Sequence, residues 1–201
     1  MTHACIEPLP VARVGALAAP DPSRRWLVEG VWSRVGVGIL GGPPKCAKSW
    51  LALDVALSVA TGTPCLDTFE VHEPGDALLV MAEDAPEVVR ARLGSICAHR
   101  GLAIESVPVH LVLAHALRLD LDADRERLCE TLARMRPRLL VLDPFVRLHR
   151  LEENHAGDVS GLLGWLRTLS REHERAILVV HHARKNGAGG AQAGQALRGS
   201  G

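Results

Sequence analysis

The sequence predicts an α/β fold in which a mainly parallel sheet carries helices on both faces. Short, continuous apolar runs alternate with longer helical patterns along the chain, and such runs are typical of parallel strands that are buried on both sides. Several runs end in acidic, histidine or glycine residues. Because ligands of parallel sheets bind beyond the carboxyl ends of the strands, a functional site is expected where these polar residues follow them.

Each expected strand is one of these apolar runs, namely residues 35–40, 77–82, 109–114, 139–142 and 176–180. The expected helices are residues 47–61, 86–100, 123–135 and 159–173. Gly62 and Pro64 end the first helix, whereas the second has Pro86 near its first turn and Gly101 after its end. The third helix is charged and amphipathic, and the fourth has one apolar face.

The two ends of the chain differ in composition from the middle. Residues 1–25 contain many Ala and Pro, and we expect them to form a flexible lead-in to one domain at residues 26–201. After Lys185 the chain is rich in Gly, Ala and Gln without apolar periodicity, which predicts a mobile loop. We expect the chain to stop before the last strands of its fold.

Composition limits the function classes. The chain has 201 residues, 47% of them hydrophobic, which suffices for one domain with a proper core. Its 23 basic and 23 acidic residues exclude a global basic field for nucleic acid, though not a local patch. The absence of Tyr disfavours an aromatic platform for single strands. Five Cys without a C-x-x-C pair predict reduced thiols, and no apolar run reaches the ~18 residues of a membrane span. We therefore expect a cytoplasmic protein without a membrane partner.

The strongest functional signal is GGPPKCAKSW at residues 41–50, between an expected strand and helix. It follows the P-loop pattern G-x-x-x-x-G-K-[ST], in which backbone N–H groups and the helix N-terminus bind phosphate. Lys48 is expected to reach the β- and γ-phosphates of ATP, and Ser49 to ligate Mg²⁺. The residues expected to hold the nucleotide are Gly42, Pro43, Pro44, Lys45, Cys46, Ala47, Lys48, Ser49 and Trp50.

Two loop positions leave alternatives open. Ala47 stands where the pattern has Gly, and a positive φ there would cost roughly 1–2 kcal/mol. Cys46 is either a reactive thiol among N–H groups or a small tolerated residue, and we favour the second. The whole segment could also be a strand–turn–helix connection that contains Lys-Ser by chance.

Two carboxylates are expected at the same edge. Asp143 closes the run 139–142 in a Walker B arrangement and would hold Mg²⁺ opposite Ser49, unless it only caps a turn. Glu83 follows the second strand, expected one strand over from the P-loop, where it would orient the attacking water. The alternative role, capping the next helix, we assign to Asp84.

Basic residues supply further candidates. His181 and His182 follow the last strand, and one of them is expected to donate a hydrogen bond near the γ-phosphate. A metal site at this pair is disfavoured because no third ligand is evident. Arg184 and Lys185 contact phosphate or are solvated, with equal support. For Arg90 and Arg92, a solvated helix surface is favoured over contact with the base or ribose.

The segments GPPKCAKSWLALDVALSVATG, LLVMAED, LLVLDPF, LVVHHARK and LRGSG occur in this order. Together they resemble the RepA-type AAA ATPases, relatives of plasmid replicative helicases in the RecA/DnaB/KaiC superfamily, from about Trp26 to the end of the chain. The resemblance implies a RecA-like core that binds ATP and Mg²⁺ between subunits of a ring, often a hexamer. It also implies Lys48 and Ser49 as phosphate and metal ligands, Glu83 as catalytic base, Asp143 as Walker B residue and His182 as γ-phosphate sensor.

The same resemblance implies that residues 186–196 face a central channel for single-stranded DNA, and that an arginine finger would follow residue 201. The predicted function is ATP hydrolysis that drives work on DNA. Alternatives are a KaiC-like regulatory ring without DNA translocation and a degenerate nucleotide-binding module. A small-molecule kinase is less favoured because an Arg-rich lid is not evident.

Overall fold

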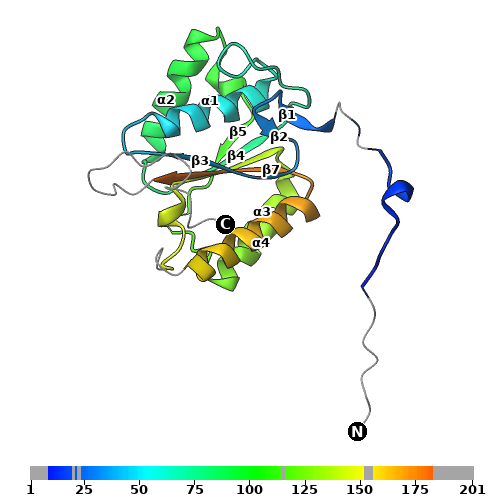
Figure 1. Cartoon of the computed structure of the whole chain (residues 1–201). Helices are drawn as coiled ribbons and strands as arrows, with labels where there is room; N and C mark the ends of the chain where they lie inside the picture. The colour runs from blue at the N-terminus through cyan, green and yellow to red at the C-terminus, as the bar shows by residue number, and fades with distance from the viewer. Residues whose placement is uncertain (1–8, 20, 22–23, 115, 152–155, 183–201) are drawn as a thin grey trace, which may run out of the picture.

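The computed structural model describes residues 9–19, 21, 24–114, 116–151 and 156–182 and shows a parallel sheet between two layers of helices (Figure 1). The strands of this sheet are β3 (Gly36–Gly42), β4 (Ala77–Met81), β5 (Val109–Leu111), β6 (Leu139–Asp143) and β7 (Ala176–His182). The helices are α1 (Lys48–Thr61), α2 (Pro86–His99), α3 (Asp122–Met135) and α4 (Ala156–Glu172). The predicted α/β class, with helices on both faces, is confirmed.

The strand order places the carboxyl ends of all five strands on one edge. The order is β3-β7-β6-β4-β5, and every neighbouring pair is parallel. In register, Gly42 lies opposite His182, and Met81 lies opposite Asp143. The expectation that Glu83 lies one strand over from the P-loop is wrong, because β7 and β6 separate β4 from β3. Pairing between distant segments sets this order, and local sequence patterns do not report it.

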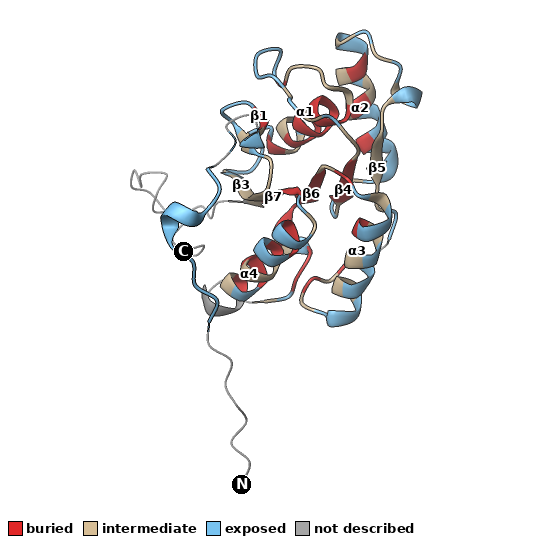
Figure 2. Cartoon of the chain, turned by 90° about the vertical axis from the view of Figure 1, so that its right-hand side faces the viewer, coloured by how far each residue is buried: buried red, intermediate tan, exposed pale blue. Residues whose placement is uncertain are grey.

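The two faces of the sheet bury separate hydrophobic clusters. In β6, Leu139 and Val141 belong to the cluster under α1 and α2, whereas Leu140 and Leu142 belong to the cluster over α3 and α4. This alternation follows from the two-residue period of a strand. Figure 2 shows buried residues along β4, β6 and β7 between the helix layers. Burial on both sides explains why these strands are continuous apolar runs rather than alternating ones.

An antiparallel hairpin precedes the sheet and was not predicted. Its strands are β1 (Trp26–Val28) and β2 (Trp32–Ser33), and it packs over β3. A Cβ atom at Gly38 would lie 2.3 Å from the Trp32 ring, so this close approach requires glycine. The strands are too short to show a periodic pattern, which is why the sequence did not indicate them.

Shorter elements complete the described part of the chain. They are the 3-10 helices η1 (Val14–Ala16), η3 (Ile104–Ser106) and η4 (Phe145–Arg147). The edge strand β5 ends at Leu111 instead of residue 114, because its pairing with β4 ends there. Leu113, beyond the strand, is 70% exposed. Within the described ranges, no helix combines the length and apolar character needed to cross a bilayer.

Candidate functional site

The loop between β3 and α1 has the backbone of a phosphate-binding turn. Lys45 and Ala47 adopt positive φ angles of 63° and 62°. Ala47 is the N-cap residue of α1, and its methyl side chain cannot accept a hydrogen bond from the first helical turn. The N–H groups of that turn therefore remain available to an anion, which the helix dipole also favours. The positive φ meets the condition under which Ala in place of Gly carries a strain of roughly 1–2 kcal/mol.

Lys48 is turned back into this loop. Its side chain is 5% exposed, and Nζ donates hydrogen bonds to the carbonyl oxygens of Gly42 at 3.0 Å and Pro43 at 2.8 Å. A buried ammonium is stable only with such acceptors or an opposite charge. The loop thus encloses the amino group of Lys48 between its own carbonyl oxygens.

Gly42 leaves the space in which the loop closes. A Cβ atom there would lie 2.8 Å from Sγ of Cys46 and 3.7 Å from Cδ of Lys48. A larger residue at this position would therefore displace the Cys46 sulfur, although the φ of Gly42 is not positive. Left-handed turns, a buried ammonium and a close-packed glycine together fit a bound polyphosphate.

The mouth of the loop includes a residue that sequence reasoning placed elsewhere. A pocket of about 360 Å³ is lined by Lys45, Cys46, Ala47, Lys48, Ser49, Trp50 and Arg92. The guanidinium of Arg92 lies 5.9 Å from the ring centroid of Trp50, which is 43% exposed. The interpretation of Arg92 as a solvated surface residue is therefore wrong. The signal in the sequence was its position on the helix that follows Glu83.

Arg92 is oriented by Asp84, whose expected role was different. Nη1 and Nη2 of Arg92 donate to the two carboxylate oxygens of Asp84 at 2.5 Å and 3.1 Å. Ala85, not Asp84, is the N-cap residue of α2, so the predicted cap is wrong. A bidentate guanidinium–carboxylate pair is stronger than a single cap bond, which explains the preference.

Asp143 ends β6 at the same edge of the sheet. Its side chain is 3% exposed, and its backbone oxygen accepts a hydrogen bond from Ala82 N at 2.7 Å. The Asp143–Pro144 peptide is cis. Since adjacent strands lie about 4.8 Å apart, β6 is two spacings, or roughly 10 Å, from the P-loop strand. Ser49, partly exposed in the first turn of α1, lies on the loop side of this gap.

Glu83 lies beyond β4 and forms an ion pair that sequence reasoning missed. Nε of Arg147 donates to Oε1 of Glu83 at 2.8 Å. The side chains are 44% exposed for Glu83 and 65% for Arg147. Arg147 belongs to η4, which directly follows Asp143 and Pro144. The 64 positions between the two residues explain why no local pattern pointed to their contact.

The histidine pair ends the strand next to the P-loop strand. The β3–β7 register places His181 opposite Gly41 and His182 opposite Gly42. The backbone of His182 is thus beside the start of the loop, while its side chain lies outside the described residues. Arg184, Lys185 and residues 186–196 also lie outside them. Their expected roles stay predictions.

Three of the four described cysteines are set apart from the loop. Burial, together with Asp54, raises the pKa of the Cys65 thiol to about 12. Burial also raises the pKa values of Cys97 and Cys129. These thiols are therefore protonated and unreactive at neutral pH. Cys46 is exposed in the loop.

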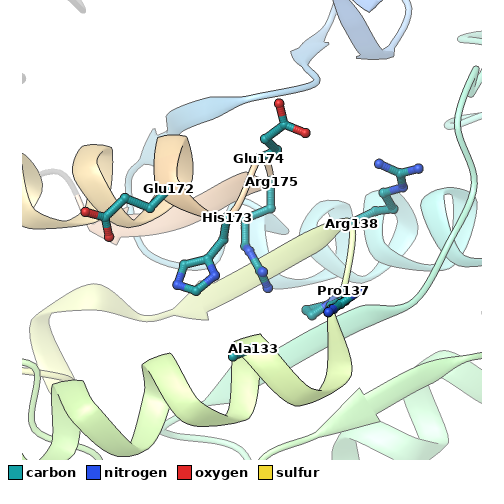
Figure 3. Close-up of a pocket in the computed structure, with 8 residues that line it drawn as sticks. Ala133, Pro137, Arg138, Glu172, His173, Glu174 and Arg175 are labelled. Carbon is teal, nitrogen blue, oxygen red and sulfur yellow. The ribbon is translucent and has the colours of Figure 1, made fainter.

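A larger cavity, of about 660 Å³, lies at the opposite edge of the sheet (Figure 3). Arg175 points toward α3 in this view, whereas Glu172 and Glu174 point away from it. Arg175 is 3% exposed, and its Nη1 donates to the carbonyl oxygen of Leu132 at 3.2 Å. Burial lowers the pKa of this guanidinium. The residues that line the cavity are Ala133, Arg136, Pro137, Arg138, Glu172, His173, Glu174 and Arg175, a set that includes no predicted site residue.

Comparison with known protein families supports the assignment made from the loop. The family model described as an AAA domain matches residues 4–188. This range contains the P-loop, both carboxylates at the strand ends and the histidine pair. It also contains the hairpin and all five strands of the parallel sheet.

Proposed function

Because the chain belongs to the AAA-domain family of P-loop ATPases, we propose that it binds ATP with Mg²⁺ and hydrolyses it to drive work on DNA. The observation that carries the proposal is the buried ammonium of Lys48, held on the carbonyls of Gly42 and Pro43 inside a left-handed loop. A structural connection between strand and helix has no need of a buried positive charge. A polyphosphate gives that charge its partner.

Each residue of the proposed site has its own role in ATP hydrolysis. Lys48 and the loop N–H groups bind the phosphate oxygens and stabilise the negative charge that develops during cleavage. Ser49 and Asp143 would hold the metal ion. When bound, Mg²⁺ would supply positive charge that stabilises the negative charge developing on the phosphate groups. Glu83 orients the attacking water and accepts its proton, and His182 detects the γ-phosphate.

The pocket mouth supports a contact with the remainder of the nucleotide. Trp50 and Arg92 flank the loop, and Asp84 fixes the Arg92 guanidinium by two hydrogen bonds. We assign this pair to the ribose or base side of ATP. Guanidinium and indole groups both stack on aromatic rings, which suits that position.

The DNA-directed part of the proposal rests on the resemblance of the ordered segments to RepA-type ATPases. It includes a ring of copies of this chain, a hexamer in that type, with single-stranded DNA passing through its centre. A KaiC-like regulatory ring is the second candidate. The zero formal net charge and the 3% aromatic content favour this second candidate.

The experiment measures ATP binding and turnover by the whole chain, with and without single-stranded DNA, beside sedimentation to report assembly. Lys48→Ala is expected to weaken ATP binding by at least ~100-fold, or about 2.7 kcal/mol. Glu83→Gln is expected to keep ATP binding and to lower turnover by roughly 10²–10⁴-fold. Arg90→Ala, an exposed change on α2, serves as the matched control.

Each outcome separates one candidate from another. Turnover stimulated by single-stranded DNA supports the DNA-directed function, whereas turnover that DNA does not alter supports the regulatory ring. Binding without turnover identifies a degenerate nucleotide-binding module. Equal turnover by the unchanged chain and Glu83→Gln rejects Glu83 as the base.

A further inference from the structure

We propose that Arg147 is a positioning residue for ATP hydrolysis, which holds the Glu83 carboxylate in the orientation that activates water. The inference rests on the proposed function and extends it to a residue outside the P-loop and the strand ends. Its starting point is the hydrogen bond from Nε of Arg147 to Oε1 of Glu83 at 2.8 Å.

The segment that carries Arg147 is firmly anchored. Phe145 and Leu148, on either side of it, are 2% and 1% exposed. The Leu148 oxygen accepts a hydrogen bond from Leu119 N at 2.6 Å, and Arg147 N donates to the oxygen of Pro144 at 3.1 Å. The guanidinium is exposed, but its backbone is fixed on a packed turn. Arg147 therefore reaches Glu83 from a well-defined point.

Glu83 lacks such support of its own. It lies in the bend between β4 and α2, and its side chain is 44% exposed. An exposed Glu side chain samples several rotamers unless a partner selects one. The bond from Arg147 occupies Oε1, and among the residues that the structure describes none donates a hydrogen bond to Oε2, which can accept a proton from water. A base held by a separate orienting group is a recurrent arrangement in active sites.

The same two segments also carry the expected metal ligand. Ala82 N donates to the oxygen of Asp143 at 2.7 Å, and Arg147 follows Asp143 on the same stretch of chain. The ion pair between Arg147 and Glu83 thus closes a second link across the ends of β4 and β6. These two links fix Glu83, the proposed base, relative to Asp143, the proposed metal ligand. We expect their relative position to be preserved when a nucleotide binds.

An exposed ion pair can also be of no consequence, since most such pairs contribute little to stability. The pair between Arg90 and Glu105 provides the matched case, with an N–O distance of 3.0 Å and exposures of 65% and 71%. Arg90 belongs to α2 and Glu105 to η3, and neither is a residue of the proposed site. If Arg147 acts only as a surface charge, Arg147→Ala and Arg90→Ala will behave alike.

The test compares steady-state ATP turnover by the whole chain and its variants. Arg147→Ala is expected to lower kcat about tenfold, a part of the roughly 10²–10⁴-fold that a general base supplies. KM for ATP and the thermal unfolding temperature are expected to stay unchanged, because neither phosphate binding nor the core is touched. Arg147→Lys is expected to restore part of kcat, while Arg90→Ala leaves it unaltered.

A double variant separates positioning from a general structural effect. In the Glu83→Gln background, Arg147→Ala is expected to cause no further loss, because the group that it orients no longer accepts a proton. An unchanged kcat in Arg147→Ala, or an equal loss in both backgrounds, overturns the assignment of Arg147. Absence of turnover in the unchanged chain instead overturns the proposed function, so the two failures are distinguishable.

Discussion

The two edges of the parallel sheet each bury a cation, and they use it in opposite ways. At the carboxyl edge, Lys48 is 5% exposed and directs its ammonium at the carbonyls of a strained loop. At the amino edge, Arg175 is 3% exposed and donates to the oxygen of Leu132 near the end of α3. Lys48 is bonded within its own loop, whereas Arg175 joins α3 to the start of β7.

The surroundings show which role each cation has. Ser170 Oγ donates to the oxygen of Arg175 at 2.6 Å and accepts from Gly36 N at 2.8 Å. Arg175 is thus part of a set of bonds that joins α3, α4 and β3. Lys48 lies instead beside residues with positive φ and beside Gly42, where a Cβ atom would displace the Cys46 sulfur. Backbone strain is concentrated at functional sites in proteins, while hydrogen bonds that join separate elements contribute to stability.

The largest expected effect falls on the amino edge. Arg175→Ala removes a buried donor and leaves a cavity, and it is expected to lower the free energy of unfolding by about 2–4 kcal/mol. Urea denaturation measures this loss. ATP affinity of the folded protein is expected to stay the same. The exposed Arg171→Ala serves as control, and a change in ATP affinity without lost stability would contradict the division between the edges.

The next effect tests the space inside the loop. Gly42→Ala places a Cβ atom 2.8 Å from Sγ of Cys46, and it is expected to cost roughly 1–3 kcal/mol and to weaken ATP binding. The double variant with Cys46→Ala removes the contacting sulfur and is expected to recover most of both losses. Denaturation and calorimetric titration check the pair. Simple additivity of the two changes would exclude the clash as the cause.

A smaller, pH-dependent effect is expected at the amino edge. A hydrogen bond from Arg34 lowers the pKa of Glu73, which also lies 3.3 Å from Arg138. Glu73→Gln is therefore expected to cost about 1 kcal/mol at pH 7. The stabilisation is complete above the unfolded pKa of about 4.3 and is lost as pH falls through the lower folded pKa. Denaturation at pH 7 and pH 3, with Glu70→Gln as control, should show the difference shrink in acid.

The smallest effect is a gain at the carboxyl edge. Ala47 has a φ of 62°, and glycine adopts this angle without strain. Ala47→Gly removes that strain but increases the freedom of the unfolded chain, so a net stabilisation of about 0.5–1 kcal/mol is expected. Thermal unfolding checks it. A loss of stability would show that the methyl group makes a compensating contact.

Features that depend on residues close together in the sequence were predictable, whereas features that depend on contacts between distant segments were not. The run 139–142 was recognisable as a strand because burial on both faces makes it wholly apolar. The P-loop was recognisable because its chemistry lies within ten consecutive residues. The strand order was not recognisable, because it depends on which distant segments pair. The hairpin at residues 26–33 was missed because its strands are too short to show a periodic pattern.

The same distinction applies inside the site. Asp84 looked like a helix cap because caps are local, yet Arg92 on the next turns of α2 competes for its carboxylate. The partner of Glu83 is 64 positions away and required the fold. The role of His182 stays a prediction, since only its backbone, opposite Gly42, is described.

Trp50 gives the chain a built-in optical probe. The sequence contains four Trp and no Tyr, so ultraviolet emission of the protein comes almost wholly from indole. Trp26 and Trp32 lie in the hairpin and Trp165 lies in α4, which leaves one fluorophore at the mouth of the loop. Replacing those three by Phe would make the emission spectrum a direct, label-free readout of events beside Lys48.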